Sequence, residues 1–217
     1  MTGEALMFVI TADQVDSRHT RDLVSHTIGH LDRAFGAGLA LPVDRNAGDE
    51  LQALILDSDT AVSMILELTR TGTWSVGLGT GDVERPLAHA TREARGPAFI
   101  AARAAVESAK RSPQRFAVRH GHTSNTVDTT DFEALMLLLL AVRDRRTEQG
   151  WQVYDLLAAK RTQREAAESL GITPQAVSDR MSVAQVRLDL EAHAPLGRML
   201  SRLASPSELS TKGHATP

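Results

Sequence analysis

The stretch from Thr162 to Met181, TQREAAESLGITPQAVSDRM, predicts two short helices joined by a tight turn. Thr162 and Glu165 have the three-residue spacing of a capping box, in which the two residues satisfy each other's backbone N–H groups at a helix start. Gly171 stands where a left-handed residue ends the first helix. The second helix therefore begins a few residues beyond this glycine.

The start of the second helix is marked as clearly as the end of the first. Thr173 can cap it, and Pro174 occupies the first turn, which is the one helical position that tolerates proline. Ala167 is small at a point where two helices approach closely. The side chains expected to face inward are Ile172, Val177 and Met181.

A small residue four positions before the glycine and a branched apolar residue six positions after it have the spacing of a DNA-binding helix-turn-helix. The stretch resembles region 4 of sigma factors and the helix-turn-helix of many small bacterial regulators. An ordinary pair of helices in a helical bundle is the alternative that this pattern leaves open.

The second helix of this pair would read DNA bases with its outward side chains. Gln175 suits adenine, Ser178 suits either base type, and Asp179 can accept from cytosine, whereas flanking cations suit phosphates. The alternative for each of them is that it is only a polar side chain in contact with solvent. The predicted DNA-facing residues are Lys160, Arg161, Arg164, Thr173, Gln175, Ser178, Asp179 and Arg180.

Composition narrows the class of protein. The 217 residues are 42% hydrophobic and 24% charged, as in ordinary soluble proteins, and they include no cysteine, which fits a reducing cytoplasm. No apolar run approaches the span of a bilayer, so no membrane partner is expected. The net charge of −3 means that binding to double-stranded DNA would use a local basic patch, and we expect a homodimer.

The first half of the chain alternates between strand and helix patterns. This order predicts an α+β domain with a ferredoxin-like, cyclase-like sheet that is covered by helices on one face. The strands are expected at 6–12, 39–43, 51–56, 74–79 and 115–119, and the helices at 18–35, 59–70 and 98–111.

Every segment after Thr130 has a helical pattern, and the composition changes near residue 125. We therefore expect an α+β domain at 1–125 and an all-α helix-turn-helix domain at 126–204. A last amphipathic helix is expected at 196–203. Residues 205–217 lack apolar periodicity and are expected to form a disordered tail.

Two carboxylates are expected at the same end of the sheet. Asp13 ends the first strand, and Asp49 lies at a hairpin tip after Gly48. Two such oxygen ligands, together with substrate phosphates, suit Mg²⁺, and the glycine lets a phosphate approach the backbone. The alternative is that Asp13 caps the following helix and that Asp49 is only a turn residue.

Four motifs in this half resemble those of class III nucleotidyl cyclases, in the same order and with similar spacing. The N-terminal half is also similar to the SatD family of bacterial proteins, in which such a domain can precede a helix-turn-helix. The four motifs are ITADQVDS (10–17), DRNAGDELQALI (44–55), WSVGLGTGDVE (74–84) and GPAFIAARAAVESAK (96–110).

The resemblance implies roles for individual residues. Asp13 and Asp49 match the two metal aspartates, and Arg45 stands where cyclases that use ATP often have a base-reading lysine. Ile100 and Ala104 replace an asparagine and an arginine that stabilise the transition state, a role that apolar side chains cannot serve. The expected metal ligands are Asp13 and Asp49, and the expected nucleotide-binding residues are Asp13, Gln14, Arg45, Gly48, Asp49 and Arg103.

These observations favour a transcriptional regulator whose degenerate cyclase-like domain senses a nucleotide or a nucleotide second messenger, together with Mg²⁺, or dimerises, or does both. One alternative is an active Mg²⁺-dependent nucleotidyl cyclase with a targeting module, in which another arginine replaces the missing one. A second alternative is a protein–protein adaptor, because sigma-like helix-turn-helix units sometimes bind proteins.

Overall fold

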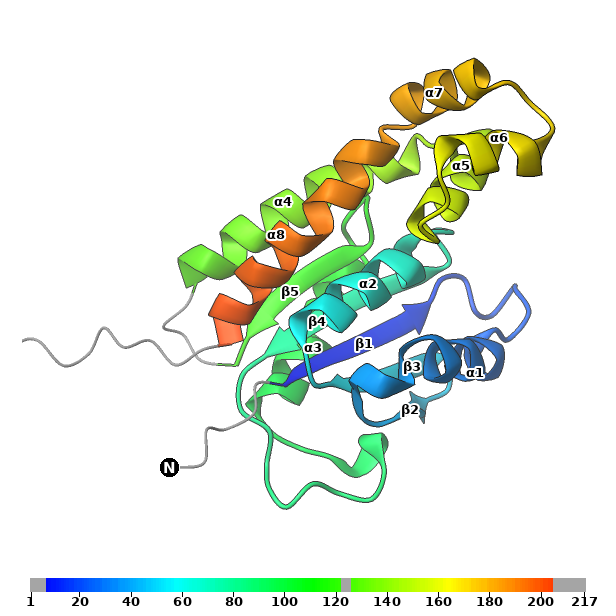
Figure 1. Cartoon of the computed structure of the whole chain (residues 1–217). Helices are drawn as coiled ribbons and strands as arrows, with labels where there is room; N and C mark the ends of the chain where they lie inside the picture. Colours follow the sequence, from blue (N-terminus) through cyan, green and yellow to red (C-terminus); the bar gives the residue numbers. More distant parts are fainter. Residues whose placement is uncertain (1–6, 122–125, 205–217) are drawn as a thin grey trace, which may run out of the picture.

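A computed structural model describes residues 7–121 and 126–204, and its centre is a five-stranded mixed sheet (Figure 1). The expected tail at 205–217 lies outside the described residues. The sheet has the strand order β2-β3-β1-β4-β5. Its strands are β1 (Phe8–Gln14), β2 (Leu39–Ala47), β3 (Glu50–Ile55), β4 (Trp74–Thr80) and β5 (Phe116–His120).

The described residues form eight α-helices, so the fold is α+β as expected. Two one-turn 3-10 helices, at Gly36–Gly38 and Thr91–Glu93, complete the regular structure. The α-helices are α1 (Val24–Phe35), α2 (Ser58–Thr69), α3 (Pro97–Ala109), α4 (Thr126–Asp144), α5 (Glu148–Ala158), α6 (Gln163–Leu170), α7 (Pro174–Val183) and α8 (Val186–Ala204).

The first six strands and helices form a β-α-β-β-α-β unit. In it β1 lies between β3 and β4 and is antiparallel to both, and β2 pairs with β3 as a hairpin. This is the order and direction of the ferredoxin-like split βαβ arrangement. The helix α3 then leads to β5, which adds to β4 in parallel at the sheet edge.

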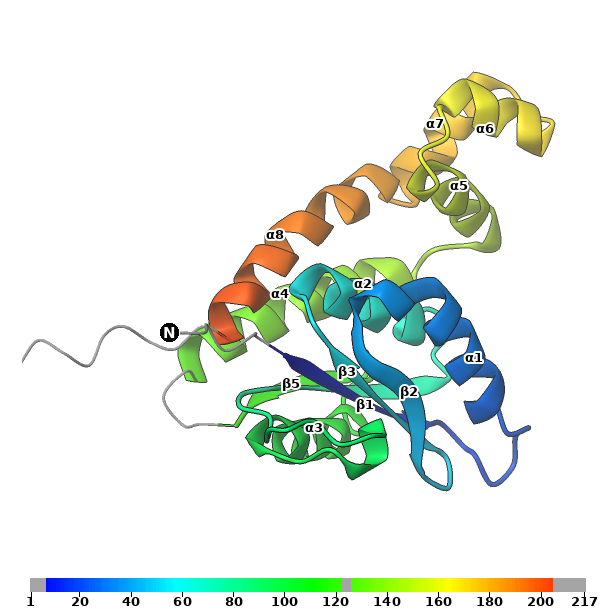
Figure 2. The same cartoon turned by 60° about the horizontal axis from the view of Figure 1, so that its bottom comes forward.

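Helices cover both faces of the sheet, so the expectation of one covered face is wrong. Figure 2 shows α1 and α2 on one side and α3 on the other. The strands are apolar on both faces, with Ile10 of β1 in the core below α2 and Val9 in the core below α3. Gly77 and Gly79 of β4 allow α3 to pack closely on the sheet. A Cβ at Gly77 would lie 2.2 Å from Val106 N, and a Cβ at Gly79 would lie 2.1 Å from Ala98 O.

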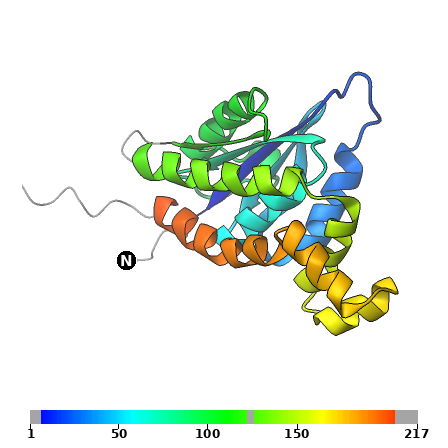
Figure 3. The same cartoon turned by 90° about the horizontal axis from the view of Figure 1, so that it is seen from above.

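The core next to α1 and α2 continues into the second half of the chain. Phe132 and Met136 of α4 and Leu200 of α8 are fully buried in the same cluster as the strand residues Ile10 and Val76. Residues on both sides of the expected domain boundary at residue 125 therefore contribute to one shared core. Seen from above, α4 and α8 run side by side across the sheet (Figure 3).

The helices α5, α6 and α7 stand away from the sheet, and α4 and α8 connect them to it (Figure 2). The helix α8 is one continuous helix over the expected segment 196–203 and ten residues before it. At Gly197 it passes close to α2, because a Cβ there would lie 2.0 Å from Asp59 Oδ1. The helix α8 thus touches α2 at one end and meets α7 at the other. Within the part of the chain that the structure describes, no helix has the length and apolar character needed to span a membrane.

Candidate functional site

The helices α5, α6 and α7 form a three-helix unit with its own small core. Thr162 and Glu165 make both hydrogen bonds of the expected capping box, and Gly171 ends α6 with φ 63° and ψ 33°. Thr173 Oγ1 accepts from Ala176 N at 3.1 Å and so caps α7. The core of the unit comprises Val153, Ala166, Ala167 and Val177, flanked by Leu156, Leu157, Leu170, Ile172 and Met181.

The outward face of α7 is mostly polar between an exposed Pro174 at its start and Val183, 83% exposed, at its end. Thr173, Gln175, Ser178 and Asp179 are exposed, and Arg180 is half-buried at the flank, as the helical spacing predicts. Gln175 Nε2 donates to Asp179 Oδ1 at 2.9 Å, so these two side chains hold each other along the helix. The side-chain oxygen of Gln175, Oε1, has no hydrogen-bond donor within the described chain. This face has the donors and acceptors that reading base edges would require.

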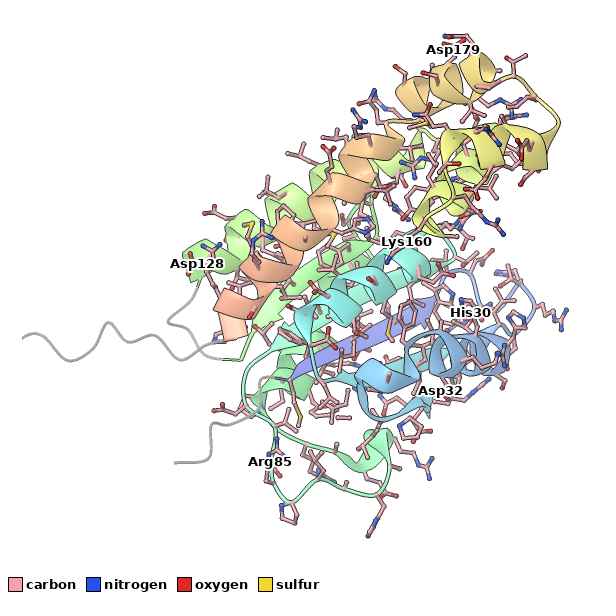
Figure 4. The ribbon with its side chains drawn as sticks, viewed as in Figure 1. His30, Asp32, Arg85, Asp128, Lys160 and Asp179 are labelled. Atoms are coloured by element: carbon pink, nitrogen blue, oxygen red, sulfur yellow. The ribbon has the colours of Figure 1, made fainter. Side chains whose placement is uncertain are left out.

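The predicted phosphate-binding cations do not all lie beside this face. Arg161 and Arg164 are exposed at the start of α6, and Arg164 makes only a weak surface ion pair, 3.3 Å from Glu168. Figure 4 shows Lys160 on the side of the three-helix unit that faces α2, and Asp179 on the far side. Arg161 and Arg164 are therefore better placed than Lys160 to accompany α7.

The two predicted metal aspartates lie at the same end of the sheet. Gln14 N donates to Asp49 O at 3.0 Å, which continues the β1–β3 ladder past Asp13. The Asp13 carboxylate pairs with Lys110 Nζ of the α3 terminus at 2.8 Å, and the Asp49 carboxylate accepts from Ser17 Oγ. Gly48 has φ 49° in the hairpin turn. In this structure each carboxylate thus has its own partner, and Mg²⁺ at this pair stays a prediction.

The ammonium group of Lys110 holds this corner together. Burial opposes its charge, but ion pairs with Asp13 and Glu107 outweigh burial and raise the pKa of Lys110 above its ordinary value. A cation bound by Asp13 would have to displace this ammonium group. No group of three or more His, Cys, Asp or Glu side chains suited to a metal occurs among the residues that the structure describes.

Gln14 and Arg45, both predicted to bind nucleotide, hold a loop in place. The buried Gln14 amide donates to Thr20 Oγ1 and Arg21 O and accepts from Leu23 N. These bonds fix residues 15–23, which is why α1 begins at Val24 and not near residue 18. Arg45 donates to Asp22 and to Gly48 O. It therefore clamps the hairpin turn against the same loop.

Glu50 is a site residue that the sequence analysis missed. It lies directly opposite Asp13 in the β1–β3 register, is 3% exposed, and accepts from Arg103 Nη1 at 2.6 Å and from Asn46 Nδ2 at 2.6 Å. The sequence signal was the position of Glu50 directly after Asp49, at the start of β3. Side chains alternate between the two faces of a strand, and Glu50 points to the face of the sheet that carries Asp13. Asp13 and Glu50 thus stand opposite each other across two strands, where Lys110 neutralises Asp13 and Arg103 neutralises Glu50.

An open groove of about 570 Å³ lies beside the Glu50–Arg103 ion pair. Ile100, Arg103, Ala104 and Glu107 of α3 form part of its lining, and Ile100 is 74% exposed there. Ile100 and Ala104, the two positions that the resemblance to cyclases would match to transition-state residues, therefore face this groove with apolar side chains. Arg103 can still bind a ligand in this groove. The apolar side chains of Ile100 and Ala104 cannot stabilise charge in a transition state.

No protein-family model, curated protein or solved structure matches this chain in the comparisons that we made.

Proposed function

We propose that this chain is a homodimeric, DNA-binding transcriptional regulator, with α7 as the recognition helix. The observation that carries the proposal is the exposed polar face of α7 on a closed three-helix core with both caps and the left-handed corner in place. In a helix-turn-helix the second helix presents its outward residues to the major groove while cations at the first helix meet phosphates. Arg161 and Arg164 of α6 suit that second role.

Duplex selection tests this function. Binders are selected from a random pool of duplexes, and fluorescence anisotropy then measures affinity at several salt concentrations. The wild-type protein is expected to show strong salt dependence, and Arg164→Ala is expected to reduce the salt slope by about one. Gln175→Ala is expected to lose about 1–3 kcal/mol of discrimination at one base position.

The matched control is Arg198→Ala, which removes an exposed arginine of α8 and changes the net charge equally. It should leave both the affinity and the salt slope unchanged. Absence of salt-sensitive DNA binding by the wild-type protein would refute the regulator and favour the protein–protein adaptor.

We further propose that the sheet with α1, α2 and α3, called the sheet unit below, resembles a cyclase domain that retains nucleotide binding without turnover. The strand order around β1, the shared position of Asp13 and Asp49, and the apolar Ile100 and Ala104 support this assignment. Calorimetric titration with ATP and GTP, with and without Mg²⁺, is expected to detect a binding event that requires Mg²⁺ and that Asp49→Ala abolishes. Formation of a cyclic nucleotide that Asp49→Ala abolishes would instead establish the Mg²⁺-dependent cyclase.

A further inference from the structure

A second cleft, distant in sequence from the predicted nucleotide site, separates the sheet unit from the α4–α5 junction. Its volume is about 350 Å³, which corresponds to roughly ten water molecules at about 30 Å³ each. Residues 69–72 and 113–115 form its wall on the sheet side. The charged and aromatic residues that line it are Arg70, Arg115, Arg143, Asp144, Arg146 and Trp151.

Positive charge exceeds negative charge in this cleft. Arg143 and Arg146 share a single buried carboxylate, Asp189, with the closest contacts at 2.7 and 2.8 Å. Arg70 pairs with Asp155 outside the cleft lining, with both contacts at 2.8 Å. Among the described residues, the Arg115 guanidinium group donates to the Ser75 hydroxyl group, 3.4 Å away, and pairs with no carboxylate.

Three of these guanidinium groups also gather around one ring. Arg70, Arg143 and Arg146 lie 4.3, 4.8 and 4.4 Å from the centroid of Trp151. Each contact is a favourable cation–π interaction, but the three cations repel one another. The ring of Trp151 in the cleft lining therefore already contacts three protein cations.

The two inner arginines also have hydrogen-bonding capacity left over. Arg143 and Arg146 are 5% and 8% exposed. Arg143 Nε has no hydrogen-bond acceptor in the described chain, and Arg146 Nη1 lies 2.8 Å from Asp189 Oδ2 without the alignment of a hydrogen bond. Burial lowers the pKa of Arg146 by more than its contacts with Asp189 raise it. The protein alone therefore leaves the positive charge at this position incompletely compensated.

We propose that this cleft binds an oligophosphate, either inorganic or the phosphate tail of a nucleotide. Guanidinium forks match phosphate oxygens in geometry, and several of them converge here from both walls of the cleft. The lining is predominantly polar, which suits a phosphate chain better than a base or an acyl group. A single bound ligand would contact the sheet side of the cleft through Arg70 and Arg115, and the buried charges of Arg143 and Arg146 in the opposite wall would attract it electrostatically.

Such a ligand would regulate the position of α7. This regulatory role rests on the proposed function, in which α7 binds DNA. Arg143 lies on α4 and donates both to Leu66 O of α2 and to Asp189 of α8. The helix α8 follows α7 directly in the chain. Oligophosphate binding would therefore stabilise one arrangement of the three-helix unit relative to the sheet and change DNA affinity.

Calorimetric titration of the full chain with inorganic tripolyphosphate, ATP and adenosine, without added metal, tests the site. Tripolyphosphate and ATP are expected to bind, and adenosine is not. Arg115→Gln should weaken binding by about tenfold or more, since a charged hydrogen bond is removed. Asp144→Asn should tighten binding, because it removes the only carboxylate in the cleft lining.

The matched control is Arg198→Gln, which removes an exposed arginine of α8 outside the cleft and should leave the affinity unchanged. Equal affinities for ATP and tripolyphosphate would identify the phosphate chain alone as the ligand, whereas tighter ATP binding would identify a nucleotide. Arg115→Gln also leaves the inner arginines intact, so its thermal unfolding should match that of the wild type.

Two results would overturn the site: no binding of tripolyphosphate by the wild-type protein, or unchanged binding by Arg115→Gln. ATP binding that is lost in Asp13→Ala but retained in Arg115→Gln would assign the nucleotide to the end of the sheet. DNA affinity is measured separately on the same variants. A protein that binds no DNA could therefore still bind oligophosphate at this cleft, and a protein that binds no oligophosphate could still bind DNA.

Discussion

At the scale of single residues, Arg143 joins four helices through one guanidinium group. It lies on α4 and donates to Asp189 of α8, to Tyr154 Oη of α5 and to Leu66 O of α2. Asp189 is 0% exposed and also contacts Arg146 and His193. The junction between the sheet unit and the three-helix unit therefore depends on one buried network of charges.

Asp189→Asn is expected to destabilise the protein strongly. The substitution leaves two buried guanidinium groups without their carboxylate, and breaking a buried ion pair by removing one partner costs about 3–5 kcal/mol. Urea unfolding measures the change in the free energy of unfolding. Glu191→Gln, at an exposed position on the same helix, is the control and should change this free energy by less than about 0.5 kcal/mol.

The same network predicts how stability depends on pH. Burial opposes the charge of Asp189, but hydrogen bonds and ion pairs with His193, Arg143 and Arg146 outweigh burial and hold its pKa below the ordinary value of 3.8. Because the folded-state pKa is depressed, this carboxylate stabilises the fold above pH 3.8. The stabilisation is lost as the pH falls through the folded-state pKa.

The difference in stability between the wild type and Asp189→Asn should accordingly narrow in acid. Urea unfolding at a series of pH values from neutral to about pH 3 measures it. A difference that stayed constant down to the lowest pH would show that the Asp189 charge does not stabilise the fold.

At the scale of elements, the corner between α6 and α7 depends on backbone conformation alone. Gly171 has a positive φ, and a Cβ at this position would meet no atom within 4 Å. Gly171→Ala therefore adds strain without a clash, and a left-handed alanine costs about 1–2 kcal/mol. We expect that loss in thermal or urea unfolding, with a smaller loss for Gly171→Asn, because asparagine tolerates this conformation.

Gly36→Ala separates strain from the mere addition of a methyl group. Gly36 also has open space at its Cβ position, but its φ of −50° and ψ of −35° are right-handed helical. Alanine there is expected to be neutral or stabilising by up to about 1 kcal/mol, because it restricts the unfolded chain. Equal losses at both positions would argue against the left-handed corner.

At the scale of the whole molecule, α4 carries a solvent-facing stripe with heptad spacing. Leu135 and Leu138 are 45% and 65% exposed, and Val142 lies on the same stripe. Exposed Asp131 and Arg145 stand at its two ends, so an antiparallel copy would place opposite charges against each other. This symmetry suits the proposed homodimer, since an antiparallel pair of helices has a two-fold axis.

Leu138→Glu is expected to raise the dimer dissociation constant by about tenfold or more, because it buries a charge at the centre of the stripe. Analytical ultracentrifugation over a range of concentrations measures the mass. Leu56→Glu, at a leucine 41% exposed just after β3, is the control and should leave the dimer intact. A wild-type chain that sediments as a monomer at every concentration would contradict this interface.

The local elements could be predicted because their signals lie within a few residues of one another. The helices α6 and α7 follow from Thr162, Gly171 and Thr173, each of which acts on backbone groups two to four positions away. The strand patterns likewise gave the strands, since alternation and turn residues are properties of adjacent positions. The hairpin placed Asp49 at a turn, whereas its position beside β1 also required β1 to pair with β3.

The tertiary structure decided the pairings between distant segments. The sequence determined the α+β order of elements and the capped helix pair, because backbone hydrogen bonds and side-chain periodicity are local. Only the tertiary structure placed α3 on the second face, joined Glu50 to Arg103 and gathered Arg70, Arg115, Arg143 and Arg146 at one cleft. Such contacts depend on which surfaces pack together, and packing is fixed by burial over the whole chain.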